Sequence, residues 1–312
     1  MLASNPQITT LAFVYNEERR LRPFLEAVRG LGPIIVIDNF STDRTVEIAR
    51  EYTSQVLQFR NAGWAEHPAV ATFALSRAQT EWIYWARVDE IPPQPLIRRL
   101  KDIAATDAAD VVMISRLNLL FGVPSTAWGR DYQLIFFRKS SVDMTRAGLF
   151  EHGAVQDNAR MLKLPATREL SLWHFSSYDV SNYTNTNNRY STIAASRIHD
   201  ERIAAVRRTS SSREVAKRFA RRLAGALRSM PYFMRLAVLP SARFLWHFVV
   251  RGGIRSGRVG LTTSYLMMME QMLIELKVAE LEKGISLDAI NAKYDALKAR
   301  LIAGEIPPLD VV

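Results

Sequence analysis

Residues 34–43 read Ile-Ile-Val-Ile-Asp-Asn-Phe-Ser-Thr-Asp, an apolar run that ends abruptly in a carboxylate and small hydroxyl side chains. Four consecutive aliphatic residues, all β-branched and without polar alternation, are typical of a central parallel strand that is covered on both faces. Ligands of such sheets bind at the carboxyl ends of the strands. The stretch therefore predicts that Asp38 lies at the rim of a ligand cleft.

The residues after Asp38 predict a turn and then a helix. Ser41, Thr42 and Asp43 are good helix-capping residues, and a helical pattern follows over residues 44–50. Both aspartates either contact a ligand or only shape the turn. The isolated position of Asp38 after four apolar residues favours a ligand contact there, whereas both roles stay open for Asp43.

On either side of this stretch, short apolar runs alternate with helical patterns, which is the signature of βαβ units. The expected strands cover residues 8–14, 34–37, 55–59, 82–86, 110–115 and 133–138. The carboxylates at positions 38 and 89–90 both follow strands, so they are expected to converge on one cleft. The predicted fold class is α/β, with a mostly parallel sheet flanked by helices and a C-terminal helical extension.

Composition sets limits on the chemistry. The chain has 312 residues, 48% of them hydrophobic, which is enough for a substantial core. It has no cysteine, which excludes disulfides, thiolate nucleophiles and thiolate metal sites, so a metal would need carboxylates or the five histidines. The N-terminus lacks the pattern of a secretory signal, and no uninterrupted apolar run is long enough to predict a membrane-spanning helix.

The positive charge is concentrated in one segment. Residues 201–260 hold fourteen Lys and Arg against two acidic residues, whereas the rest of the chain holds 27 basic and 29 acidic residues. Within this segment, residues 213–234 have the pattern of a basic amphipathic helix, and Pro231, Pro240 and Gly252-Gly253 are expected to divide it into pieces. Further helices are expected at 261–283 and 286–303. The predicted domains are residues 1–200 and the basic helical extension 201–312.

Three roles remain open for the basic segment. Attraction to an anionic membrane surface fits best, because aromatic residues share the segment with arginines. Nucleic-acid binding lacks a recognisable module, so we expect no nucleic acid as partner. The third possibility is a solvated helical face.

Asp89 and Glu90 follow the expected strand 82–86 and form a tandem pair of carboxylates. Carboxylate oxygens are hard ligands that suit Mg²⁺ or Mn²⁺ held against a diphosphate. The alternative is a solvated loop ahead of Pro92 and Pro93.

Three blocks of the sequence carry a family resemblance. They are Tyr-Asn-Glu-Glu at residues 15–18, Ile-Val-Ile-Asp-Asn-Phe-Ser-Thr-Asp-Arg-Thr-Val-Glu-Ile-Ala at residues 35–49, and Glu-Trp-Ile-Tyr-Trp-Ala-Arg-Val-Asp-Glu at residues 81–90. In order and spacing they resemble the family 2 inverting glycosyltransferases of GT-A fold. Weaker similarity at residues 133–139, 149–152, 172–178 and 188–192 resembles the branch that adds sugars to the lipopolysaccharide core.

The resemblance implies a nucleotide-sugar donor and a divalent metal, Mn²⁺ or Mg²⁺, as cofactor. It implies that Asp89 is a metal ligand and that His174 completes the metal shell, although a structural, hydrogen-bonded histidine is an equal alternative. The implied acceptor is a glycan or glycolipid. The basic segment 201–260 predicts a location at the cytoplasmic face of the cell membrane. The residues implied or considered for donor binding are Val14, Asn16, Glu17, Asp38, Asp43 and Arg87.

Two positions depart from the family pattern. The family has an Asp-x-Asp triad where this chain has Arg87-Val88-Asp89, so the first carboxylate is replaced by a cation that could pair with the diphosphate. The related branch has His before Glu where this chain has Glu151 and then His152. Glu151 is the expected catalytic base that deprotonates the acceptor, with Asp157 in reserve.

Two other functions stay open at this stage. A nucleotidyltransferase would use a similar cleft, but residues 15–18 do not form the Gly-rich phosphate loop that it normally has. The cation at Arg87 makes a non-catalytic nucleotide-sugar-binding or scaffold protein a second alternative.

Overall fold

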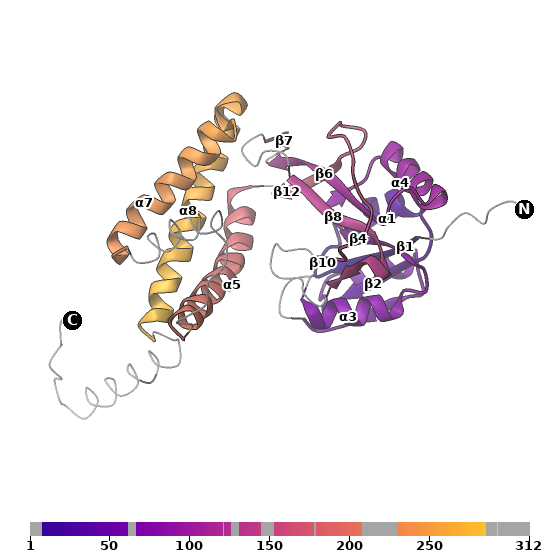
Figure 1. Ribbon diagram of the computed structural model, residues 1–312, viewed down its shortest axis with the longest axis horizontal. Coiled ribbons are helices and arrows are strands. Elements are labelled where there is room, and N and C mark those ends of the chain that lie inside the picture. The colour runs from indigo at the N-terminus through magenta and orange to yellow at the C-terminus, as the bar shows by residue number, and fades with distance from the viewer. Residues whose placement is uncertain are drawn as a thin grey trace, which may run out of the picture. The chain divides into compact units, whose positions relative to one another are not determined.

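Figure 1 shows the computed structural model, which describes residues 8–61, 67–120, 122–125, 131–144, 153–177, 179–207, 230–284 and 292. The chain divides into two compact units. The first contains Met1–Tyr183 and His247–Thr263, and the second contains Thr184–Trp246 and Ser264–Val312.

The first unit is built on a mixed sheet. Its strands are β1 (Ile8–Val14), β2 (Ile34–Asp38), β3 (Val56–Gln58), β4 (Trp82–Arg87), β5 (Glu90–Ile91), β6 (Val111–Leu120), β7 (Val123–Pro124), β8 (Asp131–Arg138), β11 (Met161–Lys163) and β12 (Leu172–Ser177). The order is β3-β2-β1-β4-β8-β6-β12-β5, and β7 and β11 also pair with β6. Only β8, β5 and β7 pair antiparallel with their neighbours in this sheet, which confirms the expected mostly parallel sheet.

Helices and a small second sheet complete this unit. The helices are α1 (Leu21–Val28), α2 (Thr45–Arg50), α3 (Pro68–Arg77) and α4 (Gln94–Thr106), and the small sheet pairs β9 (Val142–Asp143) with β10 (Ala154–Val155). A 3-10 turn occupies Lys139–Ser141. Every residue of β2 is buried, as its continuous apolar run predicts. Helix α1 buries one face, made of Leu21, Phe24, Leu25 and Val28.

The order of the strands positions the expected ligand site. From β1 the chain moves outward through β2 and β3, and then returns to the other side of β1 with β4. The carboxyl ends of β1 and β4 therefore lie side by side at the point where the strand order reverses. In open α/β sheets this is where ligands bind.

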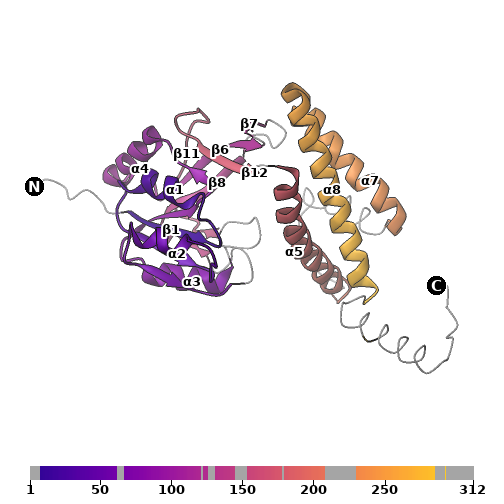
Figure 2. The same cartoon turned by 180° about the vertical axis from the view of Figure 1, so that it is seen from behind.

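The helices α5 (Val180–Arg207), α7 (Tyr232–Leu245) and α8 (Gly257–Glu282) follow, with a π-helical turn at Trp246–Val250 and a 3-10 turn at Gly253–Ser256. Figure 1 and Figure 2 show the three helices side by side. The Nζ of Lys277 on α8 donates to the backbone and side-chain oxygens of Asn188 on α5, at 2.7 and 2.6 Å. These helices are the C-terminal helical extension that the sequence predicts.

Pro240 lies inside α7, so the expectation that it breaks the segment is wrong. A proline removes one backbone hydrogen bond, here the one to the carbonyl of Leu236. The helix is nevertheless fixed to α8 on both sides of Pro240, through ion pairs of Arg235 with Glu275 and of Arg243 with Glu270. The expected helix 286–303 and most of the basic helix 213–234 lie outside the described residues.

Tyr232–Val250 is the one helix among the described residues with the length and composition to cross a membrane. It has 19 residues and a mean hydropathy of 1.2, and 11% of it is buried. The sequence predicts no membrane-spanning helix, because charged residues interrupt the apolar run in this segment. Length and composition do not distinguish a spanning helix from one that lies on a surface.

Candidate functional site

The loops after β1 and β2 are joined by hydrogen bonds between side chains of one and backbone N–H groups of the other. The N–H groups of Asn16 and Glu17 donate to the hydroxyl oxygens of Ser41 and Thr45, at 2.9 and 2.7 Å. In return, the N–H of Thr42 donates to the side-chain oxygen of Asn16 at 2.8 Å. The hydroxyl residues that follow β2 therefore shape both loops at the carboxyl ends of β1 and β2.

Asp38 ends β2 and is fully buried. Both of its carboxylate oxygens accept hydrogen bonds within this region: from the N–H of Ser41 at 3.1 Å, from its hydroxyl at 2.5 Å, and from Nε2 of Gln58 at 3.2 Å. Its neighbour in the sheet is Val14, which is also buried. As it stands, the Asp38 side chain supports the turn, and its contact with a nucleotide stays a prediction.

Asp43 lies just before α2 and accepts hydrogen bonds from Thr45, the first residue of this helix. Its carboxylate accepts from the N–H and the hydroxyl of Thr45 and from the N–H of Glu18, at 3.0, 2.5 and 3.1 Å. These bonds hold the pKa of Asp43 below its ordinary value, although burial acts in the opposite direction. The contacts are those of a residue that shapes the turn, one of the two roles left open by the sequence.

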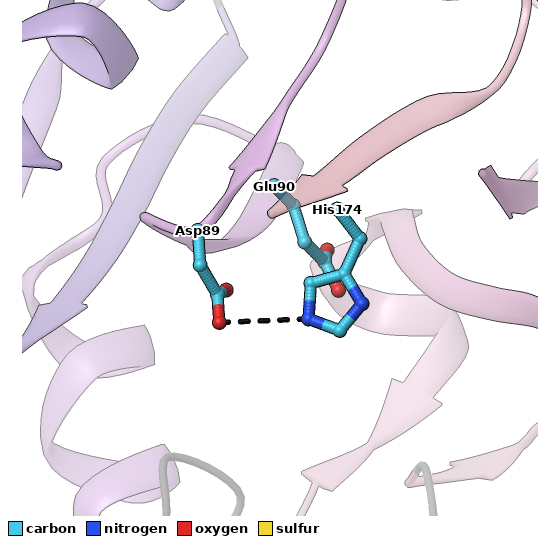
Figure 3. Close-up of side chains that lie close together, drawn as sticks. All are labelled: Asp89, Glu90 and His174. Carbon is cyan, nitrogen blue, oxygen red and sulfur yellow. Dashed lines mark ion pairs between the residues drawn. The ribbon is translucent and has the colours of Figure 1, made fainter. Parts of the chain in front are cut away.

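Asp89, Glu90 and His174 come together because β5 and β12 pair. In this antiparallel pair His174 lies opposite Glu90, and the N–H of Phe175 donates to the carbonyl of Asp89 at 2.8 Å. The candidate ligand atoms of the three side chains, one from each, lie within 4.8 Å of one another. Figure 3 shows the Asp89 carboxylate facing the His174 ring, with Nε2 at 3.5 Å from Oδ2. The predicted metal ligands Asp89 and His174 are thus neighbours.

The surroundings of Glu90 differ from the solvated loop that was the alternative in the sequence. It begins a strand and is fully buried, which excludes the solvated loop for this residue. Burial of a carboxylate is costly unless the charge is paired. Arg116 Nη1 donates to Oε1 of Glu90 at 2.9 Å, and Arg87 Nη1 lies 3.5 Å from the same oxygen.

The charged side chains around Asp89 keep its carboxylate ionised. Burial alone would raise the pKa of Asp89, but His174, Arg20 and Arg87 outweigh it and hold the pKa well below its usual range. Arg20 Nη1 lies 3.6 Å from Oδ2 of Asp89. An ionised carboxylate at this edge is available to a cation over the whole physiological pH range.

The pKa of Glu17 is shifted in the opposite direction to that of Asp89. Burial raises the pKa of Glu17 to about 7, and the nearby Asp89 adds to the rise, while Arg20 acts in the opposite direction. Arg20 binds the Glu17 carboxylate through two nitrogens, at 2.6 and 2.7 Å. Arg20 therefore bridges the loop after β1 and the carboxylate after β4.

The donor set fits a divalent cation. Nδ1 of His174 lies 2.7 Å from the side-chain oxygen of Asn118. In the neutral ring, the form that binds a metal, a proton on Nδ1 in this bond would leave Nε2, the nitrogen that faces Asp89, as the ligand atom. Oε2 of Glu90 is buried and has no hydrogen-bond partner among the described residues. Two carboxylates and an imidazole are ligands that suit Mn²⁺, and Mg²⁺ with more water.

Five residues around the site were not predicted from the sequence: Arg20, Arg116, Asn118, Asp131 and Gln133. Arg116 and Asn118 lie in the second half of β6, beyond the expected end of that strand at Ser115. Their alternation with Leu117 and Leu119 is the strand signal that could have extended it. The expected base Glu151 lies outside the described residues, and its reserve Asp157 is exposed after β10.

Comparisons with known proteins point to glycosyltransferases. Residues 12–161 match the family described as Glycosyl transferase family 2. The lipopolysaccharide core biosynthesis glycosyltransferase LpsC of Rhizobium meliloti is 25% identical over 202 residues, which cover 61% of this chain and 72% of LpsC. An uncharacterized glycosyltransferase of Rickettsia typhi is 29% identical over 115 residues, and the match spans 36% of this chain and 38% of that protein.

Solved structures give weaker likenesses. The mannosyltransferase PcManGT of Pyrobaculum calidifontis, in complex with GDP-Man and Mn²⁺, is 14% identical with a TM-score of 0.45, and 88% of each chain is covered. TarS 1–349 of S. aureus is 13% identical with a TM-score of 0.43, over 89% of this chain and 92% of TarS.

Proposed function

We propose that this chain, which carries a glycosyl transferase family 2 domain, transfers a sugar with inversion from a nucleotide-sugar donor to an envelope glycan or lipid-linked acceptor. The observation that carries the proposal is the cluster of Asp89, Glu90 and His174 next to the point where the strand order reverses. The match to LpsC, which has lipopolysaccharide core biosynthesis in its name, supports the envelope acceptor.

Asp89 and His174, with Glu90 beside them, are the residues that would hold Mn²⁺ or Mg²⁺. A bound cation would neutralise the charge that develops on the departing nucleoside diphosphate. Asp89 stays ionised for this task, and Asn118 orients the His174 ring. The loops 15–18 and 39–45 form the adjoining edge, where we place the nucleotide, with Val14, Asn16, Glu17 and Asp38 nearest to it.

Inversion requires a base on the acceptor side. The acceptor hydroxyl gives its proton to a carboxylate, its oxygen attacks the anomeric carbon, and the bond to the diphosphate oxygen breaks with its electron pair. We assign the proton transfer to Glu151, with Asp157 in reserve. Family membership makes a carboxylate the natural choice for this step.

A thermal-shift screen tests the donor site. Nucleoside diphosphates and sugar nucleotides are added to the full chain with and without Mn²⁺, because a ligand at a hundred times its dissociation constant stabilises a protein by about 2.7 kcal/mol. We expect at least one nucleotide to raise the melting temperature, more so with Mn²⁺. If no uridine, guanosine, cytidine or thymidine nucleotide shifts the melting, the donor site is wrong.

Turnover tests the enzyme itself. The donor that gives the largest shift is incubated with the chain and a lipopolysaccharide acceptor, and both transfer and donor hydrolysis are measured. We expect activity that Asp89→Ala abolishes, with Glu47→Gln, an exposed residue of α2, as the matched control. Nucleotide binding without any turnover would favour the non-catalytic alternative.

We also place the protein at the inner face of the cell membrane. Phe233, Leu245 and Trp246, in and directly after α7, are 71, 56 and 51% exposed, and apolar side chains of this size favour a lipid interface. Two of the basic residues in 201–260 are less available to an anionic surface than the sequence suggests. Arg235 and Arg243 pair with acidic residues of α8, so they contribute less to an anionic surface than the other basic residues.

Flotation of the full chain with vesicles tests this placement. Binding to vesicles that contain phosphatidylglycerol should exceed binding to neutral phosphatidylcholine vesicles, and should fall as salt screens the charge. The double variant Phe233→Ser and Leu245→Ser should bind less than the wild type. Equal flotation of wild type and double variant would remove α7 from the membrane contact.

A further inference from the structure

We propose that Arg87 is a positioning residue for Glu90, acting within a closed ring of five side chains, and that it is not a ligand of the donor phosphates. The ring consists of Arg87, Glu90, Arg116, Asp131 and Gln133. The inference rests on the metal site of the proposed function and assigns Glu90 to that site as a third ligand. Arg87 occupies the position where the family pattern has a carboxylate.

Three hydrogen bonds make up one side of the ring. Arg87 Nη1 donates to Oε1 of Gln133 at 3.0 Å, and Gln133 Nε2 donates to Oδ1 of Asp131 at 2.7 Å. Arg116 Nε donates to the other oxygen of Asp131, Oδ2, at 2.8 Å. Gln133 thus links Arg87 to the pair formed by Arg116 and Asp131.

The ring closes on one oxygen of Glu90. Arg116 Nη1 donates to Oε1 at 2.9 Å, and Arg87 Nη1 is 3.5 Å from the same atom. Oε2 of the same carboxylate is buried and has no hydrogen-bond partner among the described residues. A buried carboxylate oxygen without a donor costs free energy unless a cation supplies the missing contact.

The sheet explains why the ring forms. Strand β8 lies between β4 and β6, so Asp131 and Gln133 on β8 separate Arg87 at the end of β4 from Arg116 on β6. Arg116 is paired with Asp131 in the register of β6 and β8. The two arginines therefore approach Glu90 from the strands on either side of β8, in a framework of backbone hydrogen bonds.

The charges of the ring balance. Two guanidinium groups face two carboxylates, so the ring is neutral as a whole, and its arginines offset the repulsion between Glu90 and the nearby Asp89. Glu90 is fixed through Oε1, and its carboxylate lies beside the His174 imidazole (Figure 3). Ligands held in this way are typical of metal sites, in which partners behind the ligands orient them.

Mn²⁺ binding to the full chain in the absence of nucleotide tests the role of Arg87, with free Mn²⁺ counted by electron paramagnetic resonance. We expect Arg87→Gln to weaken Mn²⁺ binding about tenfold, the usual effect of losing a partner that orients a metal ligand. A phosphate ligand would leave this affinity unchanged, because no phosphate is present. Unchanged Mn²⁺ affinity in Arg87→Gln would therefore overturn the proposal.

Gln133→Leu is the second variant, because it keeps the three metal ligands and both arginines and removes only the link between them. We expect a similar loss of Mn²⁺ affinity, and a still larger loss in Glu90→Gln. Arg22→Gln is the control, since Arg22 makes an exposed ion pair with Glu51. Each metal-free variant is also melted, so that a folding defect is recognised by its lower melting temperature.

The outcomes separate this inference from the proposed function. Normal Mn²⁺ affinity in Gln133→Leu, or a wild type that binds no Mn²⁺ but transfers sugar, overturns the ring and leaves the transferase in place. A wild type that binds Mn²⁺ but turns over no donor contradicts the transferase, while the variants still report on the ring. The nitrogen coupling of His174 in pulsed spectra, present in Arg87→Gln and absent in His174→Ala, supports binding at this site.

Discussion

Asp38 is the residue at which a turn-forming role and a ligand-binding role compete most directly. Its oxygens accept hydrogen bonds from Ser41 and Gln58, and the side chain is fully buried. We expect Asp38→Asn to lower the free energy of unfolding by about 1–3 kcal/mol in nucleotide-free buffer, because the buried side chain that accepts from Ser41 and Gln58 loses one of its two acceptor oxygens. Urea unfolding measures this. An unchanged stability together with a lost nucleotide shift would instead assign Asp38 to the ligand.

Glu17 gives the site a dependence on pH with a definite sign. Its pKa is raised from 4.5 to about 7 in the folded protein, mainly by burial. The folded state therefore favours the protonated form, and the stability that this contributes is fully present below about pH 4.5 and is lost as the pH rises through 7. A shift of this size corresponds to at most about 3 kcal/mol.

We expect Glu17→Gln to lack this part of the pH dependence. Unfolding by urea at pH 5, 6, 7 and 8 should show the variant gaining stability relative to the wild type as the pH rises. Glu26→Gln, at an exposed residue of α1 that accepts from Tyr52, is the control. If the free energies of unfolding of wild type and Glu17→Gln differ by the same amount from pH 5 to 8, the raised pKa of Glu17 is contradicted.

Among the elements, the buried contact between α7 and α8 is the most sensitive. Arg235 and Glu275 are 7 and 3% exposed, with Nε and Oε2 3.3 Å apart. Removing one partner of a buried ion pair leaves an uncompensated charge and costs about 3–5 kcal/mol, whereas replacing both by apolar residues is often neutral.

We therefore expect Arg235→Met to be strongly destabilising and Arg235→Met with Glu275→Leu to recover most of the loss. Thermal unfolding followed by circular dichroism at 222 nm compares the two variants. Arg44→Met, which removes an exposed pair with Glu47, should leave the stability almost unchanged, because exposed ion pairs contribute little. A double variant as unstable as the single one would show that packing, not charge, dominates this contact.

The elements also show what the sequence could and could not predict. Strands β1, β2 and β4 were predicted to within a residue, because continuous apolar runs identify buried parallel strands. The second half of β6 and the whole of β12 carry polar site residues that interrupt this pattern. Asn118 and His174 are 56 positions apart and meet only because β6 and β12 pair. Single-sequence patterns hold no information on that pairing.

At the scale of the whole molecule, the division of the chain differs from a simple cut after residue 200. The first compact unit ends at Tyr183 and takes in His247–Thr263 as well. Thr263 is fully buried in this unit, and its hydroxyl lies 3.4 Å from that of Ser125. The predicted boundary at 200 falls inside α5. The charge pattern that predicted it follows the surface of the chain, whereas compact units follow packing.

A chain that ends at residue 200 should consequently be less stable than one that ends at Gly284. The shorter chain lacks His247–Thr263, and the loss of its buried contacts should cost about 1–3 kcal/mol. For a unit of this size, that corresponds to a melting temperature lower by roughly 2–12 °C, since 1 kcal/mol shifts it by about 2–4 °C. Tryptophan fluorescence follows this melting in the first unit, because Trp82 and Trp85 are buried in β4. Equal melting temperatures for the two chains would mean that residues 1–200 form the catalytic domain without help, as the sequence alone predicts.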